Sequence, residues 1–177
     1  LTPLNISMSG NLVAANTVDI TVNVDFVDFL ANWQDANVTL FVVEDSVIGT
    51  GSGYNQVNAY QGQAGHPYAN AGNPIIGYPH RHVVRQVASS SSAWGDDTFF
   101  TSAPAINSNF NKTYTVNLNP AWDQSQMEFI AFVNYYDAAT GENAREIINV
   151  NKMNFSDVVV GVAKNNINVT DFTVYPN

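Results

Sequence analysis

The chain has 177 residues, 45% of them hydrophobic, and its six Lys and Arg against 15 Asp and Glu give a formal net charge of −9. This composition suits one folded domain and excludes a disordered chain, and the negative charge argues against nucleic acid or anionic lipid as partners. With no Cys and no apolar run of roughly 18 residues, it offers neither a disulfide nor a membrane-spanning helix.

The first half of the chain predicts three strands. Residues 4–8 alternate between apolar and polar and predict a short strand that ends at the turn signal of residues 9–11, Ser-Gly-Asn. Residues 17–26, TVDITVNVDF, place five apolar side chains on one face and five polar ones on the other. One buried and one wet face is typical of an antiparallel sheet in a sandwich. Residues 38–44 are apolar on both faces and predict a central strand.

Residues 46–79 form a long connection with almost no period, rich in Gly, Asn, Gln, Tyr and Pro. A connection of this length inside a compact domain is uncommon, and such loops tend to be functional or mobile. A strand over residues 81–87 follows it. After a serine-rich loop, residues 98–101 predict a short strand that ends before Pro104.

The second half predicts strands over residues 112–118, 127–136 and 144–150, the last two joined by a hairpin loop at 137–143. Residues 155–162 predict a last strand or an extended segment. No stretch shows sustained helical periodicity. Seven to eight strands separated by turn-rich loops indicate an all-β fold, an Ig-like or jelly-roll-like antiparallel β-sandwich with one long loop.

The densest group of titratable side chains lies in residues 78–97, YPHRHVVRQVASSSSAWGDD. On a strand, His80 and His82 would share one face and could hold a metal through their imidazole nitrogens. No spacing forces further ligands together, and the candidates for them are His66, Asp96, Asp97 and Glu44. The alternative is that the two histidines form hydrogen bonds to backbone and fix the long loop to the sheet. We therefore assign no metal.

Other chemistry in this stretch has a weak signature. Ser89 to Ser92 with His82 and Asp96 suggests a hydrolase triad, but there is no G-x-S-x-G turn. Asp96 and Asp97 are oxygen ligands of the kind Ca²⁺ prefers, yet no D-x-D-x-D-G pattern is present. We expect no cofactor, and Ca²⁺ is the one ion worth considering.

Arginines and aromatic residues supply the remaining candidates. Arg81 and Arg85 could bind a ligand carboxylate, or could pair across the sheet with the acids Glu44, Asp45 and Asp96. The tyrosines of the long loop could form an aromatic platform for a sugar or peptide together with Trp94. The ligand-binding candidates are Tyr54, Tyr60, Tyr68 and Trp94.

Residues 78–85, YPHRHVVR, resemble the Y-x-H-N-H-V-L-R signature of the outer membrane protein 28-related family of Bacteroidota. Arg81 stands where the family usually has Asn, and Val84 where it usually has Leu. The resemblance extends over about residues 17–150, with VVED at 42–45 and WGD at 94–96. It implies a sandwich fold at an extracellular or outer-membrane surface, with a structural signature of His80, His82, Arg85 and Glu44.

Residues 171–177, DFTVYPN, resemble the opening of the C-terminal sorting domain read by the type IX secretion system. This resemblance implies a passenger sandwich over residues 1–160, a linker over 161–170 and the beginning of a truncated sorting domain over 171–177. It also implies the type IX secretion machinery as a partner.

Together these observations predict a non-enzymatic, secreted or cell-surface domain for binding or adhesion, or an accessory module. Its partner would be an unknown surface glycan or protein and not a nucleic acid, and the chain would not span the membrane. The alternative is a carbohydrate- or peptide-binding module of a larger secreted enzyme that uses the aromatic loop 46–79. A metal-dependent hydrolase built on His66, His80 and His82 is the third possibility.

Overall fold

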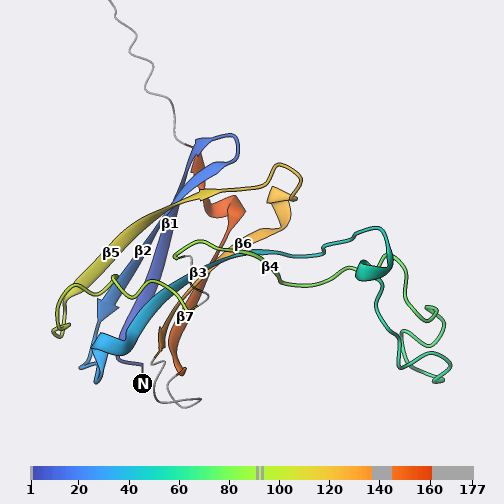
Figure 1. Ribbon diagram of the computed structural model, residues 1–177, viewed down its shortest axis with the longest axis horizontal. Coiled ribbons are helices and arrows are strands. Elements are labelled where there is room, and N and C mark those ends of the chain that lie inside the picture. The colour runs from blue at the N-terminus through green and yellow to red at the C-terminus, as the bar shows by residue number, and fades with distance from the viewer. Residues whose placement is uncertain (1, 91, 93, 137–144, 161–177) are drawn as a thin grey trace, which may run out of the picture.

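Two four-stranded β-sheets packed face to face make up the structure, a computed structural model that describes residues 2–90, 92, 94–136 and 145–160 (Figure 1). The first sheet has the order β5-β2-β1-β8, formed by Asn109–Asn117, Thr17–Phe26, Leu4–Ala14 and Val159–Val160. The second has the order β4-β3-β6-β7, formed by Val83–Val87, Ala36–Glu44, Met127–Tyr135 and Ile147–Asn154. The all-β sandwich expected from the sequence is confirmed.

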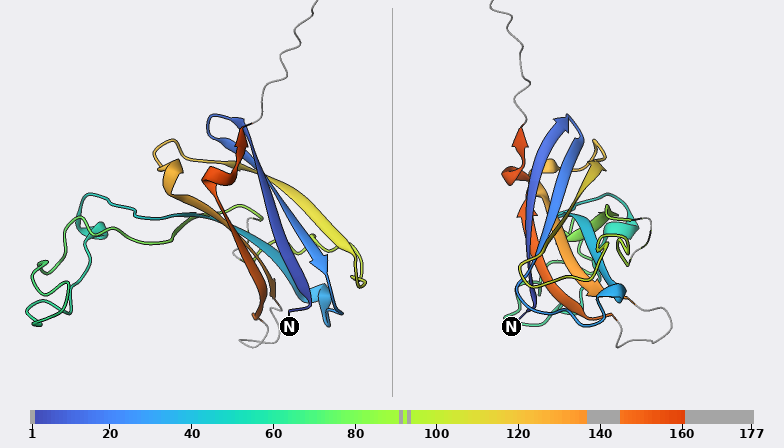
Figure 2. Two further views of the ribbon diagram at one scale, coloured as in Figure 1. Left: turned by 180° about the vertical axis from the view of Figure 1, so that it is seen from behind. Right: turned by 90° about the vertical axis from the view of Figure 1, so that its left-hand side faces the viewer.

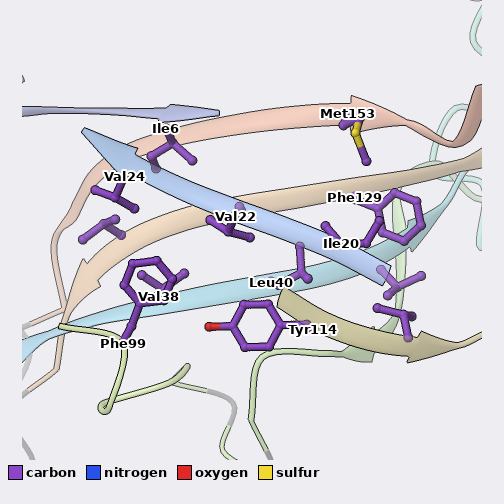
Figure 3. Packing of buried hydrophobic residues seen from close by; sticks show 14 of the residues in the cluster. Ile6, Ile20, Val22, Val24, Val38, Leu40, Phe99, Tyr114, Phe129 and Met153 are labelled. Atoms are coloured by element: carbon purple, nitrogen blue, oxygen red, sulfur yellow. The ribbon is translucent and has the colours of Figure 1, made fainter. Parts of the chain in front are cut away.

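The core lies between the two sheets, where alternate side chains of each strand meet. The apolar residues of β2 from Val18 to Val24 are fully buried, and they face β3 and β6 (Figure 3). On the outer face of β2, Thr21 shares a 2.7 Å hydrogen bond with Thr113 of β5. In the second sheet, β3 and β6 have no exposed residue, and Thr39 and Val43 of β3 are 0% and 1% exposed, so both faces of these inner strands are covered.

The expected turn at residues 9–11 is wrong, because β1 runs through it to Ala14. Gly10 is required for close packing and not for a turn. A Cβ there would lie 2.9 Å from Val158 Cγ2 and 3.0 Å from Met153 Cε. The glycine therefore lets Met153 of β7 and Val158, just before β8, approach β1 closely.

The other expected strands need smaller corrections. Residues 98–101 form no strand, although Phe99 and Phe100 are buried and Phe100 packs edge-on against Phe26 with ring centroids 5.6 Å apart. The strand expected from residue 81 begins at Val83. The last strand, β8, has only two residues and pairs with β1 in parallel, the one parallel pair in the described part of the chain. Aromatic burial without strand pairing explains the error at 98–101.

Helical structure in the described ranges is limited to short 3₁₀ turns. They are η1 (Trp33–Asp35), η2 (Ser52–Tyr54), η3 (Gln124–Gln126) and η5 (Phe155–Asp157). Over these same ranges we find no helix with the length and apolar character needed to cross a membrane.

The connection between β3 and β4 projects away from the sandwich as an arm, which we define as residues 46–80 (Figures 1 and 2). Two backbone bridges join its outgoing and returning halves, Val47 to His80 near the sheet and Gln56 to Ile75 farther out. The predicted long loop thus has an outgoing and a returning half, which these two bridges join. The linker and sorting segment expected at residues 161–177 lie outside the described residues.

Gly95 should be essential to the fold. Its φ of +92° favours glycine, and an added Cβ would lie 2.7 Å from the Val38 carbonyl oxygen and still closer to Thr39 Oγ1. We expect Gly95→Ala to lower the free energy of unfolding by about 2 kcal/mol or more, through backbone strain and this clash. Urea unfolding measures the change. Gly53→Ala is the matched control, since a Cβ there meets nothing within 4 Å; equal stability of the two variants would contradict the assignment.

Candidate functional site

The root of the arm is fixed by a buried carboxylate at the end of β3. Glu44 is 5% exposed, and its Oε2 accepts a hydrogen bond of 2.6 Å from Arg85 Nε on β4. Its Oε1 accepts the backbone N–H of Asp123 at 3.0 Å. The Arg85 guanidinium also lies 5.6 Å from the centroid of the Trp122 ring. Both carboxylate oxygens are thus occupied, and the two strands that carry the arm are tied together.

A second, more exposed set of charges surrounds the same root. Arg81 Nε lies 2.9 Å from Asp45 Oδ1, and the same oxygen accepts the backbone N–H of His82 at 3.2 Å. The His82 ring faces Glu128 with Nδ1 at 3.5 Å from Oε2, and Lys152 Nζ lies 2.7 Å from Oε1 of that glutamate. Arg81 and Arg85 therefore pair with protein carboxylates, one of the two roles that the sequence left open.

His80 connects the arm to its own root. Its backbone pairs with Val47 in both directions at 2.9 Å, and its ring Nε2 forms a 2.9 Å hydrogen bond with the carbonyl oxygen of Tyr54. His82, with φ of +49°, lies in a left-handed conformation just before β4. The two histidines do not share a strand face, contrary to the geometry that a metal pair would need. They fix the loop instead.

The outer part of the arm is organised around Asn58, which is 4% exposed. Its Nδ2 donates to the carbonyl oxygens of Tyr68 at 2.9 Å and Gly72 at 2.8 Å, and its Oδ1 accepts the N–H of Tyr60 at 3.0 Å. Its backbone N–H donates to Asn73 Oδ1 at 3.1 Å. One buried amide therefore gives this part of the arm a defined shape without an apolar core.

Aromatic rings form a continuous row along the arm. Tyr60 stacks on His66 with centroids 3.7 Å apart and planes 11° from parallel, and Tyr68 lies 5.7 Å from His66. Tyr78 continues the row, 6.2 Å from Tyr68 and 5.3 Å from His80. His66, considered from sequence as a metal ligand, is thus a member of an aromatic row. Tyr54 joins it through its carbonyl contact with His80.

The arm carries no Asp, Glu, Lys or Arg between residues 46 and 80, in a chain of net charge −9. Its aliphatic side chains point to solvent, with Ile76 82% exposed and Val57 73% exposed. The tyrosines are partly exposed as well, Tyr60 at 47% and Tyr68 at 41%. An uncharged surface of tyrosine and aliphatic groups on a projecting element is suited to contact with another molecule.

Trp94 does not belong to this surface. Its carbonyl oxygen accepts a 3.0 Å hydrogen bond from Asn37 Nδ2, at the start of β3, whereas the arm leaves from the end of that strand. The indole stacks on Tyr136 with centroids 5.0 Å apart, and the Arg145 guanidinium lies 4.4 Å from the indole centroid. The aromatic candidates therefore divide into two places. Tyr136 and Arg145 were missed as site residues because the sequence predicted strands at 127–136 and 144–150 that include them, whereas both lie just outside β6 and β7.

The family assignment follows from a match along almost the whole sequence. The chain matches the family model described as outer membrane protein Omp28 over residues 2–158. It belongs to the Omp28 family. The resemblance first seen at residues 78–85 is thereby confirmed, and at the level of the outer membrane the family's description agrees with the expected location.

Solved structures place this Omp28 sandwich among similar folds. HBP35 of Porphyromonas gingivalis is similar with a TM-score of 0.60 and 15% identity, and the match covers 99% of this chain and 46% of that one. The chain thus spans about half the length of HBP35. A domain of the outer membrane lipoprotein Omp28 from the same organism matches with a TM-score of 0.47 and 14% identity, over 86% and 87% of the two chains. No curated protein matches the chain.

The metal and nucleophile candidates are not brought together in the Omp28 sandwich. Within the described ranges no three residues among His, Asp and Glu are placed to hold an ion. Ser89 Oγ accepts the backbone N–H of Leu40 at 3.0 Å, and Ser90 and Ser92 accept backbone N–H groups of their own loop. These three serines therefore serve as hydrogen-bond acceptors for backbone N–H groups.

Asp96 is a structural carboxylate, 5% exposed, that closes the open edge of the sandwich. Its Oδ2 accepts from Lys112 Nζ at 2.6 Å and from Tyr114 Oη at 2.9 Å, and its Oδ1 accepts from Thr98 Oγ1 at 2.7 Å. Burial raises the pKa of Asp96, but these hydrogen bonds lower it more, so the pKa lies below its ordinary value. Burial and the bond to Asp96 raise the pKa of the Tyr114 hydroxyl, which stays protonated.

Asp96 should make the stability of the domain sensitive to acid. Because its folded-state pKa is depressed, its contribution is present above the unfolded-state pKa of about 3.9 and is lost as pH falls through the folded value. We expect Asp96→Asn to lower the free energy of unfolding at pH 7 by about 2 kcal/mol. Below about pH 4 the loss of stability should become shallower than in the parent.

Thermal unfolding by circular dichroism between pH 7 and pH 2.5 measures both effects. Asp97→Asn is the matched control, since Asp97 is exposed and has no hydrogen bond among the described residues. An Asp96→Asn variant with the stability and acid profile of the control would show that the buried carboxylate is not the titrating group.

Proposed function

We propose that this Omp28 domain is a non-enzymatic binding or adhesion module at the outer-membrane surface, which contacts its partner through the arm. The observation that carries the proposal is the combination of a charge-free, aromatic arm with a root fixed by Glu44 and Arg85. A projecting element without a held root would lose conformational entropy on binding, whereas a pre-shaped one loses less.

A protein partner suits the arm better than a glycan does. The exposed groups are Ile48, Val57 and Ile76 beside partly exposed tyrosines, a mixture that favours burial against another apolar surface. Tyrosine adds contact area at low entropic cost because it has only two side-chain torsions. A surface glycan remains the second class of partner, since tyrosine rings also pack against sugars.

Two features support a place outside the cell. The family description names an outer membrane protein, and the sequence DFTVYPN at residues 171–177 resembles a type IX sorting signal. Export by that system is part of the proposal.

The test is binding of the purified chain to an array of outer-surface proteins and glycans. We expect Tyr60→Ala with Tyr68→Ala to weaken binding to any partner found by at least tenfold, because interface energy concentrates in such aromatic residues. Phe29→Ala is the matched control, because Phe29 is an aromatic residue outside the arm and is 70% exposed. An array without hits, or a partner lost with Phe29→Ala and kept by the arm variant, would overturn the proposal.

A further inference from the structure

A cleft of about 260 Å³ opens beside Trp94, at the end of the sandwich opposite the root of the arm. It lies between η1, the start of β3, the loop after β4 and the end of β6. Its lining presents both polar and apolar surface and consists of Gln34, Asn37, Ser90, Ser92, Asp97 and Tyr136, with the backbone of Gly95. Sites for drug-sized ligands measure roughly 300–1,000 Å³, so this cleft suits a smaller molecule.

One wall of the cleft is held by buried polar groups. Asn37 and Asn134 are 5% and 4% exposed, and both direct their Nδ2 at the carbonyl oxygen of Trp94, at 3.0 and 3.5 Å. Thr39 Oγ1 donates to Asn134 Oδ1 at 3.0 Å, which orients that amide. Burying two amides costs free energy unless they are satisfied, and here they are satisfied by fixing one loop carbonyl. The backbone of Trp94 is thus held in place before any ligand binds.

The two residues that follow Trp94, Gly95 and Asp96, are also fixed to β3. Asp96 pairs with Val38 through backbone hydrogen bonds of 2.8 and 3.2 Å, and Gly95 lies tightly against Val38 and Thr39. The Trp94 ring in turn stacks on Tyr136, whose backbone N–H donates to the Asp35 carbonyl oxygen at 2.8 Å. Tyr136 therefore presents an ordered aromatic ring to the cleft.

The serine hydroxyls of the cleft are oriented as donors. Ser92 Oγ accepts the N–H of Trp94 at 3.1 Å, and Ser90 Oγ accepts the N–H of Ser92 at 3.1 Å. An oxygen that accepts from backbone on one side leaves its O–H to donate elsewhere. Beside them the Gln34 amide both donates and accepts, and the exposed Asp97 carboxylate accepts only.

We propose that this cleft binds a neutral sugar unit, with the Tyr136 ring against a face of the sugar and Asp97, Gln34 and the two serines on its hydroxyls. Neighbouring sugar hydroxyls each donate and accept, and this set offers both functions around one aromatic ring. Arg145 lies 5.9 Å from the centroid of the Tyr136 ring but is not part of the lining, whose one charged side chain in the described structure is Asp97. The Asp97 carboxylate and the net charge of −9 disfavour phosphates and acidic sugars. An apolar ligand could pack only against the single Tyr136 ring, and it would leave the polar groups of the lining without hydrogen-bond partners. This site is independent of the arm and of its partner.

The test is titration of the ¹⁵N-labelled chain with methyl glycosides of glucose, galactose, mannose and N-acetylglucosamine, followed by two-dimensional NMR. We expect at least one glycoside to bind in the millimolar range or tighter, with shift changes centred on Gln34, Asn37, Ser92 and Tyr136. Asp97→Asn, at an exposed position, should weaken binding at least tenfold. Tyr136→Ala should abolish it, and Tyr60→Ala in the arm should leave it unchanged.

Several outcomes would overturn the proposal. They are no binding of any of the four glycosides up to about 50 mM, shift changes that map to the arm, or binding that both Asp97→Asn and Tyr136→Ala leave intact. Preference for glucuronic acid or methyl phosphate over the neutral glycosides would contradict the assigned ligand class. Because Tyr60→Ala separates the two surfaces, failure of the sugar site is distinguishable from failure of the arm as a binding element.

Discussion

The Glu44–Arg85 pair is the constraint on which the position of the arm depends. β3 and β4 are adjacent strands, but 38 residues separate the end of one from the start of the other. Closing such a connection costs entropy, and a buried carboxylate left without its partner would cost about 3 kcal/mol more. With both of its oxygens occupied, Glu44 sets the direction in which the arm leaves the sheet.

At the opposite end of the sandwich, buried polar groups likewise fix a loop to the sheet. Asp96 takes hydrogen bonds from Lys112, Tyr114 and Thr98, and Asn37 and Asn134 hold the carbonyl of Trp94. Each group is satisfied in the described structure, where no buried side-chain nitrogen or oxygen lacks a partner. The sandwich is therefore an apolar core with a cluster of buried polar groups at each end, and each of the two proposed binding surfaces begins at one of these clusters.

The fold could be predicted because alternation reports burial directly. Residues 17–26 were assigned correctly to the residue, and 38–44 and 127–136 nearly so, since a strand's two faces are visible in its side chains. Gly10 misled because a glycine needed for close packing is indistinguishable in sequence from one needed for a turn. Phe99 and Phe100 misled because burial does not require a strand.

The candidate site was predictable only in part, because its contacts depend on loops and periodicity reports only strands. The pairing of Arg81 and Arg85 with carboxylates was one of the two roles expected from the sequence, because the chain has 15 acidic residues for only six Lys and Arg. Trp94 was grouped with the arm tyrosines by composition, although it lies at the other end of β3. Contacts such as Trp94 with Tyr136, or Asn58 with Gly72, depend on how loops return to the body. No periodicity encodes that return.

The absence of charge from the arm has a consequence for the range of forces around the molecule. At physiological salt, charges are screened within about 8 Å, so the acidic body repels another acidic surface only at close approach. Eight residues separate the bridges at Val47 and Gln56, and the nine steps between them span at most about 30 Å in extended chain. A neutral tip held that far out can touch an anionic envelope while the body stays outside the repulsive layer, so attachment through the arm would be nearly independent of ionic strength.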